Sequence, residues 1–541
     1  MRRSRSRLGW VLAAGWIAQV ALRLWLYRYH TGPVANPDES GYLLAARWLA
    51  GGPGADLSGS TFYQAGYASV LVPIFWFVAD PVTAYRLVVV VGSMAAAGAF
   101  PLAYLLLRRM GLGGRASLVL AFVTGLSPAL LLFSGLALAD AILPALVLGW
   151  LVATHDFVAR GSVRAAVAAG AISGFAMGVH LRGMVVLAVF SLTVAVVFRR
   201  VPRRAAAGAL LAAGATVAVG KALNGSLSAA LYPSGARDLT GMLVSRLTSA
   251  EGQAWALSGA AGQLWYLIVG TWGLAGVGMA GAVVLLMRRA APFAHRVLAG
   301  ILLVTTLGIA YASSAALPDE HRVGNYVYGR YLACVAVAWT LAGALALIRS
   351  GRPAVLRYAA AATGLPAVMG GVAAWYAGDR LDRYGFIAFD FPEVIFLTGV
   401  PDKLDMVRTS LCALILLACL VAAAFLTAGR ARLLVAGGLA LINIAFTAHL
   451  APSPPSGGRD WLPAPRPGQA VALDKRVKWN VWVPLSYRIW WTELRRFDGP
   501  PPQDACTAVV PPDVAPPPGW VATGEGGAAQ GWTTWSNPNC P

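Results

Sequence analysis

Long apolar runs recur along the chain from Leu8 to Leu450, and they constrain the fold more than any other feature. Each run holds roughly 20 residues, the length that an α-helix needs to cross the hydrocarbon core of a bilayer. Only 12% of the residues are charged, against roughly 25% in soluble domains. The sequence therefore predicts an all-α polytopic membrane protein.

The runs and their flanking residues together predict a bundle of about 13 transmembrane helices. The first run follows an Arg-rich start and is too long for a signal peptide, so we expect an uncleaved first span. The predicted spans are residues 8–29, 83–107, 116–134, 138–154, 165–180, 183–198, 205–223, 263–287, 297–316, 331–348, 354–376, 407–428 and 433–450.

The formal net charge of +20 is concentrated in short segments between alternate runs. These segments contain clustered arginines, such as Arg108 with Arg109 and Arg199 with Arg200, and among them only one acid, Asp156. This alternation is the positive-inside pattern, which predicts a cytoplasmic N-terminus in the plasma membrane. The positive charge therefore indicates topology, and we expect the lipid bilayer, not nucleic acid, as its partner.

The composition changes after residue 450, which predicts three parts of the chain. Residues 1–450 form the transmembrane domain, and residues 451–468 form a Pro/Gly-rich linker. Residues 469–541 form a small extracytoplasmic domain of α/β type, with short strands at 470–473 and 481–483 and a helix at 485–497. Cys506 and Cys540 both lie in this part, and whether they form a disulfide is left open by their spacing.

The first external loop, residues 30–82, contains the clearest candidate site. Two stretches, near 40–49 and 69–78, are predicted as juxtamembrane helices packed on the bundle. Asp38 and Glu39 stand where the first of these helices begins. Two interpretations are open: the acids cap and charge the helix N-terminus, or one of them faces a cavity and takes a proton from an acceptor hydroxyl.

Two tight external turns hold further candidates. Asp140 is a lone acid between two apolar runs, either a turn residue or a partnered site acid. Arg182 follows His180 in a turn that the charge pattern places outside. It is either a snorkelling side chain or a phosphate ligand at the membrane surface.

The external segment 318–331 combines acids, arginines, a histidine and tyrosines. Its candidate substrate-binding residues are His321, Arg322, Tyr328 and Arg330. The alternative interpretation is that the segment is an ordinary interfacial loop. The sequence shows no HExxH or CxxC spacing, so we expect that no metal or other cofactor is required. A divalent ion held by His180, His321, Asp38 and Asp140 is the alternative.

Several short motifs occur in the order of a known superfamily. They are Pro37 to Tyr42, Phe62 to Tyr67, Ser127-Pro128 followed by Asp140, and Gly178 to Gly183. With this topology, residues 8–350 resemble the GT-C glycosyltransferases that use polyprenyl-phosphate sugars. The branch includes protein O-mannosyltransferases and the aminoarabinose transferases of lipid A. The chain departs from the pattern at Gly135, where the family has Arg, and at Arg182, which replaces a Lys.

The resemblance implies an inverting transfer of a hexose or pentose to an envelope glycan, lipid or protein on the extracytoplasmic face. It implies Asp38 as general base, Glu39 as a positioning or donor-contacting acid and Asp140 as a second site acid. It implies Arg182 as a donor-phosphate contact, and His180 belongs to the same motif. His321, Arg322, Tyr328 and Arg330 are added from local composition alone.

Two other functions are consistent with a polytopic chain. A lipid or sugar transporter or flippase would need ionisable residues near the middle of the bilayer. Here the acids and arginines lie at the outer ends of the runs, which favours chemistry at the membrane surface. A non-catalytic envelope-assembly protein on the same fold is the second alternative, and loss of function on changing Asp38 distinguishes an enzyme from it.

Overall fold

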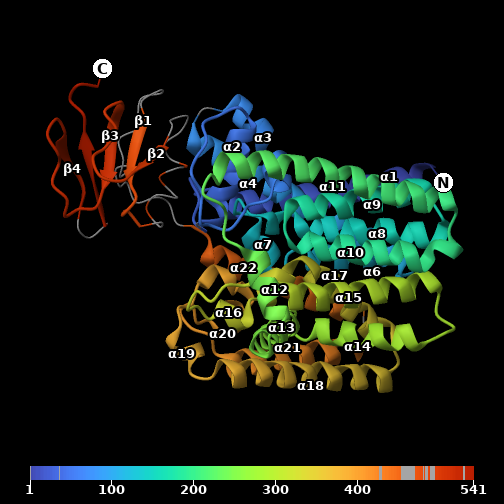
Figure 1. Cartoon of the computed structure of the whole chain (residues 1–541). Helices are drawn as coiled ribbons and strands as arrows, with labels where there is room; N and C mark the ends of the chain where they lie inside the picture. Colours follow the sequence, from blue (N-terminus) through green and yellow to red (C-terminus); the bar gives the residue numbers. More distant parts are fainter. Residues whose placement is uncertain are drawn as a thin grey trace.

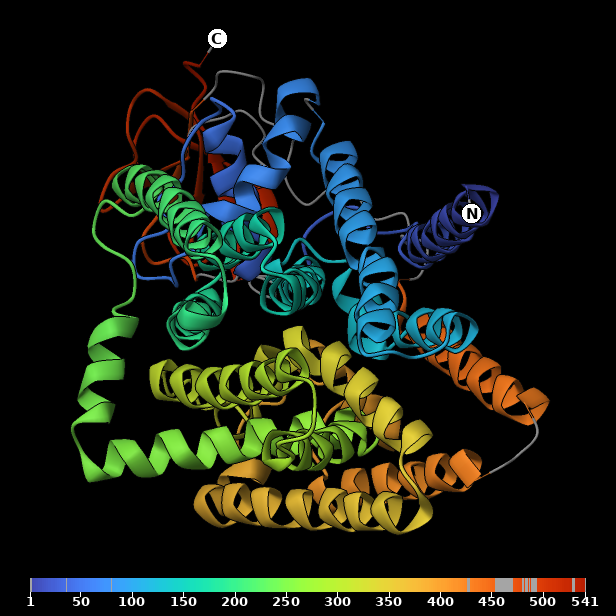
Figure 2. The ribbon, with the colours of Figure 1, turned by 90° about the vertical axis from the view of Figure 1, so that its right-hand side faces the viewer.

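The chain folds into a helix bundle with a five-stranded sheet at one end (Figure 1). The computed structural model describes residues 2–35, 37–78, 80–425, 429–452, 470–478, 481, 485, 487, 494–527 and 531–540. Figure 2 shows the helices up to α11 in the upper part of the bundle and those from α13 to α18 below them. The two groups meet where α8 and α10 pack against α15 and α17.

The helices follow the apolar runs and the first external loop. The first group is α1 (Arg2–Leu26), α2 (Asp38–Leu49), α3 (Ala65–Phe77), α4 (Pro81–Ala97), α5 (Ala99–Arg109), α6 (Gly114–Thr124), α7 (Pro128–Phe133), α8 (Leu143–Arg160), α9 (Val163–Val179), α10 (Arg182–Val197) and α11 (Arg203–Leu231). The second group is α12 (Leu239–Leu247), α13 (Ala250–Gly270), α14 (Leu274–Met287), α15 (Phe293–Ala316), α16 (Gly324–Val327), α17 (Ala333–Arg349), α18 (Arg352–Ala377), α19 (Arg380–Arg383), α20 (Pro392–Thr398), α21 (Met406–Phe425) and α22 (Gly429–Leu450). Short 3-10 turns are η1 (Ala139–Ala141), η2 (Phe198–Arg200), η3 (Gly329–Leu332) and η4 (Ala388–Asp390).

The prediction of a polytopic helical membrane protein is confirmed. Within the described ranges, eight helices are long and apolar enough to cross a membrane, or nine if the bent pair α13 and α14 is one span. The count of about 13 stays a prediction, because some expected spans form shorter apolar helices. These shorter helices include Gly114–Thr124, Val163–Val179 and Leu434–Leu450.

The segment 263–287, expected as one straight span, is broken into two helices. The helices α13 and α14 meet at an angle of 108°. At the break, Trp272 and Gly273 have φ values of +54° and +77°, in the left-handed region that ends a right-handed helix. The bend turns the end of α13 away from α14, and Tyr266 and Gly270 of α13 lie against Glu393 of α20.

The Arg-rich segments meet at one end of the bundle. The Arg349 guanidinium donates to the Met110 carbonyl over 2.6 Å. The Arg200 guanidinium lies 4.0 Å from the centre of the Phe293 ring. His295 Nε2 lies 3.2 Å from the Arg109 carbonyl oxygen and joins these two pairs. Four segments that the charge pattern assigns to one side of the membrane therefore lie together in the fold. Which side faces the cytoplasm stays a prediction.

The two juxtamembrane helices of the first loop are confirmed as α2 and α3. The helix α2 begins directly after Pro37 and is buried over most of its length, including Leu43 and Leu44. It packs on α3, which in turn packs on α4 and α9. This burial fixes the first loop against the bundle, so that residues at the start of α2 have defined positions.

The described C-terminal residues form one mixed sheet. Its strands are β1 (Ala470–Asp474), β2 (Leu494–Phe497), β3 (Ala505–Val510), β4 (Val521–Gly527) and β5 (Trp532–Ser536), in the order β2-β1-β3-β5-β4. β1 pairs in parallel with β2 and β3, and β5 is antiparallel to β3 and β4. The strand expected at 470–473 is confirmed. Residues 494–497 form a strand where a helix was expected, because they pair with β1, and Val481 is helical where a strand was expected.

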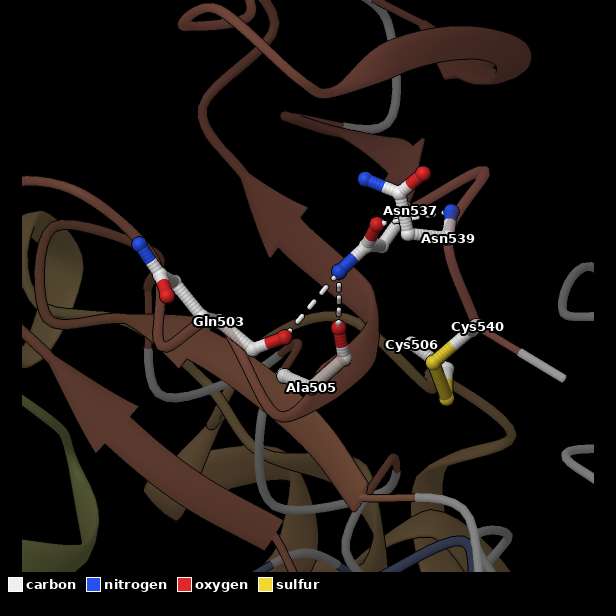
Figure 3. The surroundings of a disulfide bond; sticks show 6 residues. All are labelled: Gln503, Ala505, Cys506, Asn537, Asn539 and Cys540. Atoms are coloured by element: carbon white, nitrogen blue, oxygen red, sulfur yellow. Dashed lines mark hydrogen bonds between the residues drawn. A yellow bond between two sulfur atoms is a disulfide. The ribbon is translucent and has the colours of Figure 1, made fainter.

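The sheet packs on the membrane bundle. The Tyr487 hydroxyl donates to the Pro81 carbonyl over 2.7 Å, and Val471 and Leu494 belong to the same apolar core as α2 and α3. A disulfide joins Cys506 to Cys540, so this pairing is now established (Figure 3). Most of the expected linker 451–468 lies outside the described residues, and the domain boundaries stay predictions.

Candidate active site

A cavity of about 920 Å³ opens beside the first loop and collects most of the candidate residues. Its walls come from the first loop, α10, α12, α15, η3, the segment before α20 and Arg496 of β2. Seven residues expected from the sequence line it: Asp38, His180, Arg182, His321, Arg322, Tyr328 and Arg330. Glu39 and Asp140 stand behind this wall, where they hold residues that do line it.

Asp38 presents its carboxylate to the cavity. It is the first residue of α2 and follows the N-cap residue Pro37, so Asp38 is not itself the N-cap residue. Its Oδ1 accepts a hydrogen bond from the Tyr63 hydroxyl over 3.1 Å, and its Oδ2 accepts one from Arg330 Nη1 over 2.9 Å. The side chain is 30% exposed, which leaves it within reach of a substrate.

Gly41 explains part of the acidic motif. A Cβ atom at this position would lie 2.0 Å from the Tyr63 ring. Only glycine therefore allows Tyr63 to pack against α2 one turn after Asp38 and to reach its carboxylate. The motif from Pro37 to Tyr42 thus builds the support of Asp38 as well as supplying the acid.

Glu39 is fully buried and occupies a different environment from Asp38. Its Oε1 accepts from the backbone amides of Val34 and Ala35, each over 2.7 Å. Its Oε2 accepts from the Ala137 amide over 2.7 Å and from the Tyr85 hydroxyl. The carboxylate thereby ties the first loop to the turn that precedes η1, which is a positioning role.

Asp140 lies between two arginines, and we call Arg182, Asp140 and Arg330 the deep triad. Arg182 Nη2 is 2.7 Å from Asp140 Oδ1, and Arg330 Nε is 3.0 Å from Oδ2. Between 2% and 6% of each side chain is exposed. Burial alone would raise the pKa of Asp140, but the two guanidinium groups outweigh it and hold that pKa below its ordinary range. Arg182 is therefore a buried ion-pair partner and does not snorkel.

Gly135, where the family pattern has an arginine, is explained by its neighbour. A Cβ atom there would lie 2.5 Å from atoms of the Tyr27 ring, so no arginine fits. Asp140 receives its second guanidinium from Arg330, which lies in η3.

The two histidines line the cavity separately. His180 Nδ1 accepts from Arg182 Nε over 3.2 Å, and burial together with Arg182 holds the pKa of His180 well below its usual range, so the imidazole is neutral. His321 is exposed, with its ring 5.2 Å from that of Tyr384. Among the described residues, no group of three or more His, Cys, Asp or Glu is arranged to hold a metal ion.

A second acid between two arginines lies at the more exposed end of the cavity, and we call Arg237, Glu320 and Arg322 the open triad. Arg322 Nη2 is 2.9 Å from Glu320 Oε2, and Arg237 pairs with the other carboxylate oxygen. The side chains are 34%, 34% and 19% exposed, respectively. The sequence reasoning named Arg322 but gave no role to Arg237.

Asp390 joins the site and was missed by the sequence reasoning. Its Oδ1 lies 3.5 Å from Arg330 Nη1, and its Oδ2 lies 3.9 Å from Arg322 Nη1. The residue is fully buried, and this burial raises its pKa to about 6 against the lowering effect of the arginines. Its signal in the sequence is an acid between Phe389 and Phe391, which indicates burial.

Glu393 lies on α20, near Asp390. Its Oε2 accepts a hydrogen bond from the Tyr266 hydroxyl over 2.7 Å, and burial raises its pKa to about 7. Tyr328 completes this side of the site, because its hydroxyl lies 3.3 Å from Arg330 Nη1.

Comparison by sequence finds no matching protein-family model and no matching curated protein. Comparison of folds does find similar structures. ArnT from Cupriavidus metallidurans, bound to undecaprenyl phosphate, matches with a TM-score of 0.54 at 15% identity over 98% of both chains. The same protein in the apo state matches with a TM-score of 0.54 at 16% identity, again over 98% of both chains.

Arabinosyltransferase EmbB from Mycobacterium smegmatis is more distant. It matches with a TM-score of 0.43 at 16% identity, over 80% of this chain and 40% of its own length. The likeness to ArnT spans the bundle and the C-terminal sheet, and at this identity it establishes architecture. The chain has the GT-C fold.

Proposed function

We propose that the protein is a membrane glycosyltransferase that moves a hexose or pentose from a polyprenyl phosphate to an acceptor hydroxyl. One observation carries the proposal above all: on a GT-C fold, a single cavity contains an accessible carboxylate, Asp38, next to buried guanidinium groups, Arg182 and Arg330. The carboxylate can accept the proton that the acceptor hydroxyl loses. The guanidinium groups can stabilise the negative charge that develops on the leaving phosphate.

The donor phosphate is expected at Arg182 and Arg330. Guanidinium groups bind phosphate oxygens through paired N–H donors, and burial strengthens these bonds. Support comes from the similar fold of ArnT, which was solved with undecaprenyl phosphate bound. A phosphate at Arg330 would compete with Asp38 for the guanidinium and leave the Asp38 carboxylate ready to accept a proton.

The lipid tail has an apolar route between two helices. Met184 and Val185 of α10 and Ile309 and Ala312 of α15 line the same cavity as the arginines. Both helices are long and apolar enough to cross the membrane. A polyprenyl chain lying between them would keep its phosphate at the membrane surface and its tail in the hydrocarbon region.

The proposed reaction is a single displacement with inversion. The acceptor oxygen attacks the anomeric carbon while the bond from that carbon to the phosphate oxygen breaks. The proton of the acceptor hydroxyl passes to an Asp38 oxygen, and polyprenyl phosphate leaves with the bonding electrons. Asp140 holds Arg182 and Arg330 in place, Asp390 contacts Arg330 from another side, and Glu39 fixes the backbone before Asp38.

We propose that the reaction takes place on the extracytoplasmic face of the plasma membrane, with an envelope glycan, lipid or protein as acceptor. The Arg-rich segments lie together at one end of the bundle, and the positive-inside rule assigns that end to the cytoplasm. The cavity and the sheet, proposed as a domain of residues 469–541, then lie outside. The disulfide between Cys506 and Cys540 is consistent with an oxidising compartment.

The test is label transfer by the purified full-length protein in detergent. A panel of polyprenyl phosphates carrying radiolabelled hexoses or pentoses serves as donors, and a cell-envelope extract serves as acceptor. We expect label in the extract from at least one lipid donor and none from nucleotide sugars. Transfer from nucleotide sugars alone would overturn the donor assignment. Donor binding without transfer to any acceptor would favour a transporter.

A further inference from the structure

Gln64 lines the cavity from the loop between α2 and α3, and its side-chain amide has one defined orientation. The Ala65 amide donates to Asn224 Oδ1 over 2.8 Å, so the other terminal atom of Asn224 is the Nδ2 donor. This Nδ2 donates to Gln64 Oε1 over 2.5 Å. The backbone of α3 thus orients Asn224 of α11, and Asn224 in turn orients Gln64 so that its oxygen is already in use.

The Nε2 amine of Gln64 is the free end of this series of hydrogen bonds. Nothing in the described part of the chain accepts a hydrogen bond from it, and it is not among the unpartnered polar atoms that are enclosed by protein. Gln64 is only 8% exposed and belongs to the cavity wall. An unpaired donor in a nearly buried side chain is costly, so an acceptor atom of a ligand in the cavity would bind there favourably.

Gln64 lies in the segment that joins the proposed base to the proposed phosphate ligand. The hydroxyl of the residue before it donates to Asp38 Oδ1 over 3.1 Å. Two residues after it, Gly66 packs so closely on the end of α9 that a Cβ atom there would lie 2.5 Å from the Gly178 carbonyl oxygen. The turn that follows α9 leads to Arg182, where α10 begins.

The proposed reaction requires the donor sugar to lie between these two parts of the site. The anomeric carbon is bonded to the leaving phosphate oxygen, and the attacking oxygen approaches it from the opposite side to roughly 3–3.5 Å. The attacking oxygen must also lie within hydrogen-bond reach of the base. A phosphate at Arg182 and a base at Asp38 therefore leave the sugar ring beside the segment that carries Gln64.

We propose that Gln64 is a specificity-determining residue whose Nε2 amine donates a hydrogen bond to an oxygen of the donor sugar. The inference rests on the proposed function for the lipid-linked donor, and it adds the residue that recognises the sugar itself. A sugar with an oxygen in this place supplies the missing acceptor. A sugar without one leaves the amine unpaired, which is how a buried polar group discriminates between similar substrates.

Binding of the lipid with and without a sugar tests this role. Undecaprenyl phosphate, and the same lipid phosphate carrying glucose, mannose or arabinose, are titrated into the full-length protein in detergent. Gln64→Met keeps the length of the side chain and removes the donor. We expect it to weaken the binding of at least one sugar-carrying lipid at least about fivefold and to leave the affinity for undecaprenyl phosphate within about twofold of the wild type.

Gln253→Met is the matched control. Gln253 Oε1 also accepts a hydrogen bond, from the Tyr311 hydroxyl over 2.8 Å, but Gln253 does not line the cavity. The control should leave the binding of all four lipids unchanged.

Two results for Gln64→Met would overturn the inference while the donor class stands. An equal loss of binding for all four lipids would show that Gln64 only supports the loop, and no loss for any of them would show that the sugar is not recognised there. If the wild type bound none of the four lipids, the proposed function would itself be overturned, and this inference with it.

Discussion

The deep triad and the open triad have the same arrangement of charges but different surroundings. In each, one carboxylate lies between two guanidinium groups in the wall of one cavity. Asp140 of the deep triad is 2% exposed, while Glu320 of the open triad is 34% exposed. Because the strength of an ion pair depends on the solvent around it, the same three charges have different consequences in the two places.

Burial makes the deep triad a fixed part of the site. Taking charges out of water is costly, so a buried carboxylate needs its partners, and Arg330 of this triad also contacts Asp38 and Asp390. The ion pairs of the open triad are exposed, and water and salt already weaken them. A ligand can therefore replace one of the paired side chains. The deep end is therefore suited to holding catalytic geometry, and the open end to admitting a ligand.

The largest expected difference between the triads is in stability. Asp140→Asn removes the buried carboxylate charge that Arg182 and Arg330 share and should cost roughly 3–5 kcal/mol of the free energy of unfolding. Glu320→Gln makes the same kind of change in solvent and should cost about 0–1 kcal/mol. Unfolding of both variants in the same detergent measures the difference. Equal losses would show that burial does not distinguish the two triads.

A smaller effect is expected from pH at the deep end. Burial raises the pKa of Glu393 from 4.5 to about 7. The folded state therefore favours the protonated acid, so its stabilising contribution is complete below about pH 4.5 and is lost as pH rises through about 7. Glu393→Gln keeps a neutral acceptor for Tyr266, so its melting temperature should match the wild type at pH 5 and exceed it at pH 8.

Glu320→Gln controls for the general effect of replacing an acid by an amide, because its side chain is already exposed. If the melting temperatures of Glu393→Gln and the wild type differed by the same amount at pH 5 and at pH 8, the assignment of a protonated, buried Glu393 would be contradicted.

The sequence predicted the fold well, for physical reasons, and it named residues that line one cavity in the structure. Apolar runs of membrane length and alternating arginines are local signals, and they led to the polytopic bundle and to the clustering of Arg108 and Arg199 segments at one end. Asp140 was identified because a lone acid between apolar runs needs a partner, and Asp38 was identified because it stands where a first-loop helix begins. Arg182 was identified because an external arginine departs from the charge pattern, and Arg330 was identified from the local composition of the segment 318–331.

The contacts between distant segments were not predictable in the same way. The Asp390 to Arg330 contact and the place of Arg496 in the cavity depend on how separate segments pack, which no local pattern encodes. The bend at Trp272 was missed because the residues on both sides of it are equally apolar. Residues 494–497 form a strand because β1 is available to pair with them, a tertiary effect that overrides local propensity.

The most direct test of the central claim measures transfer and donor binding together in Asp38→Asn, with the donor that proves active in the panel. The change keeps the shape of the side chain and removes the base. The account predicts that transfer falls by at least about a hundredfold while the donor still binds, because removing a general base affects the chemical step. Transfer at the wild-type rate with unchanged donor binding would contradict the account and would show that Asp38 is not the base.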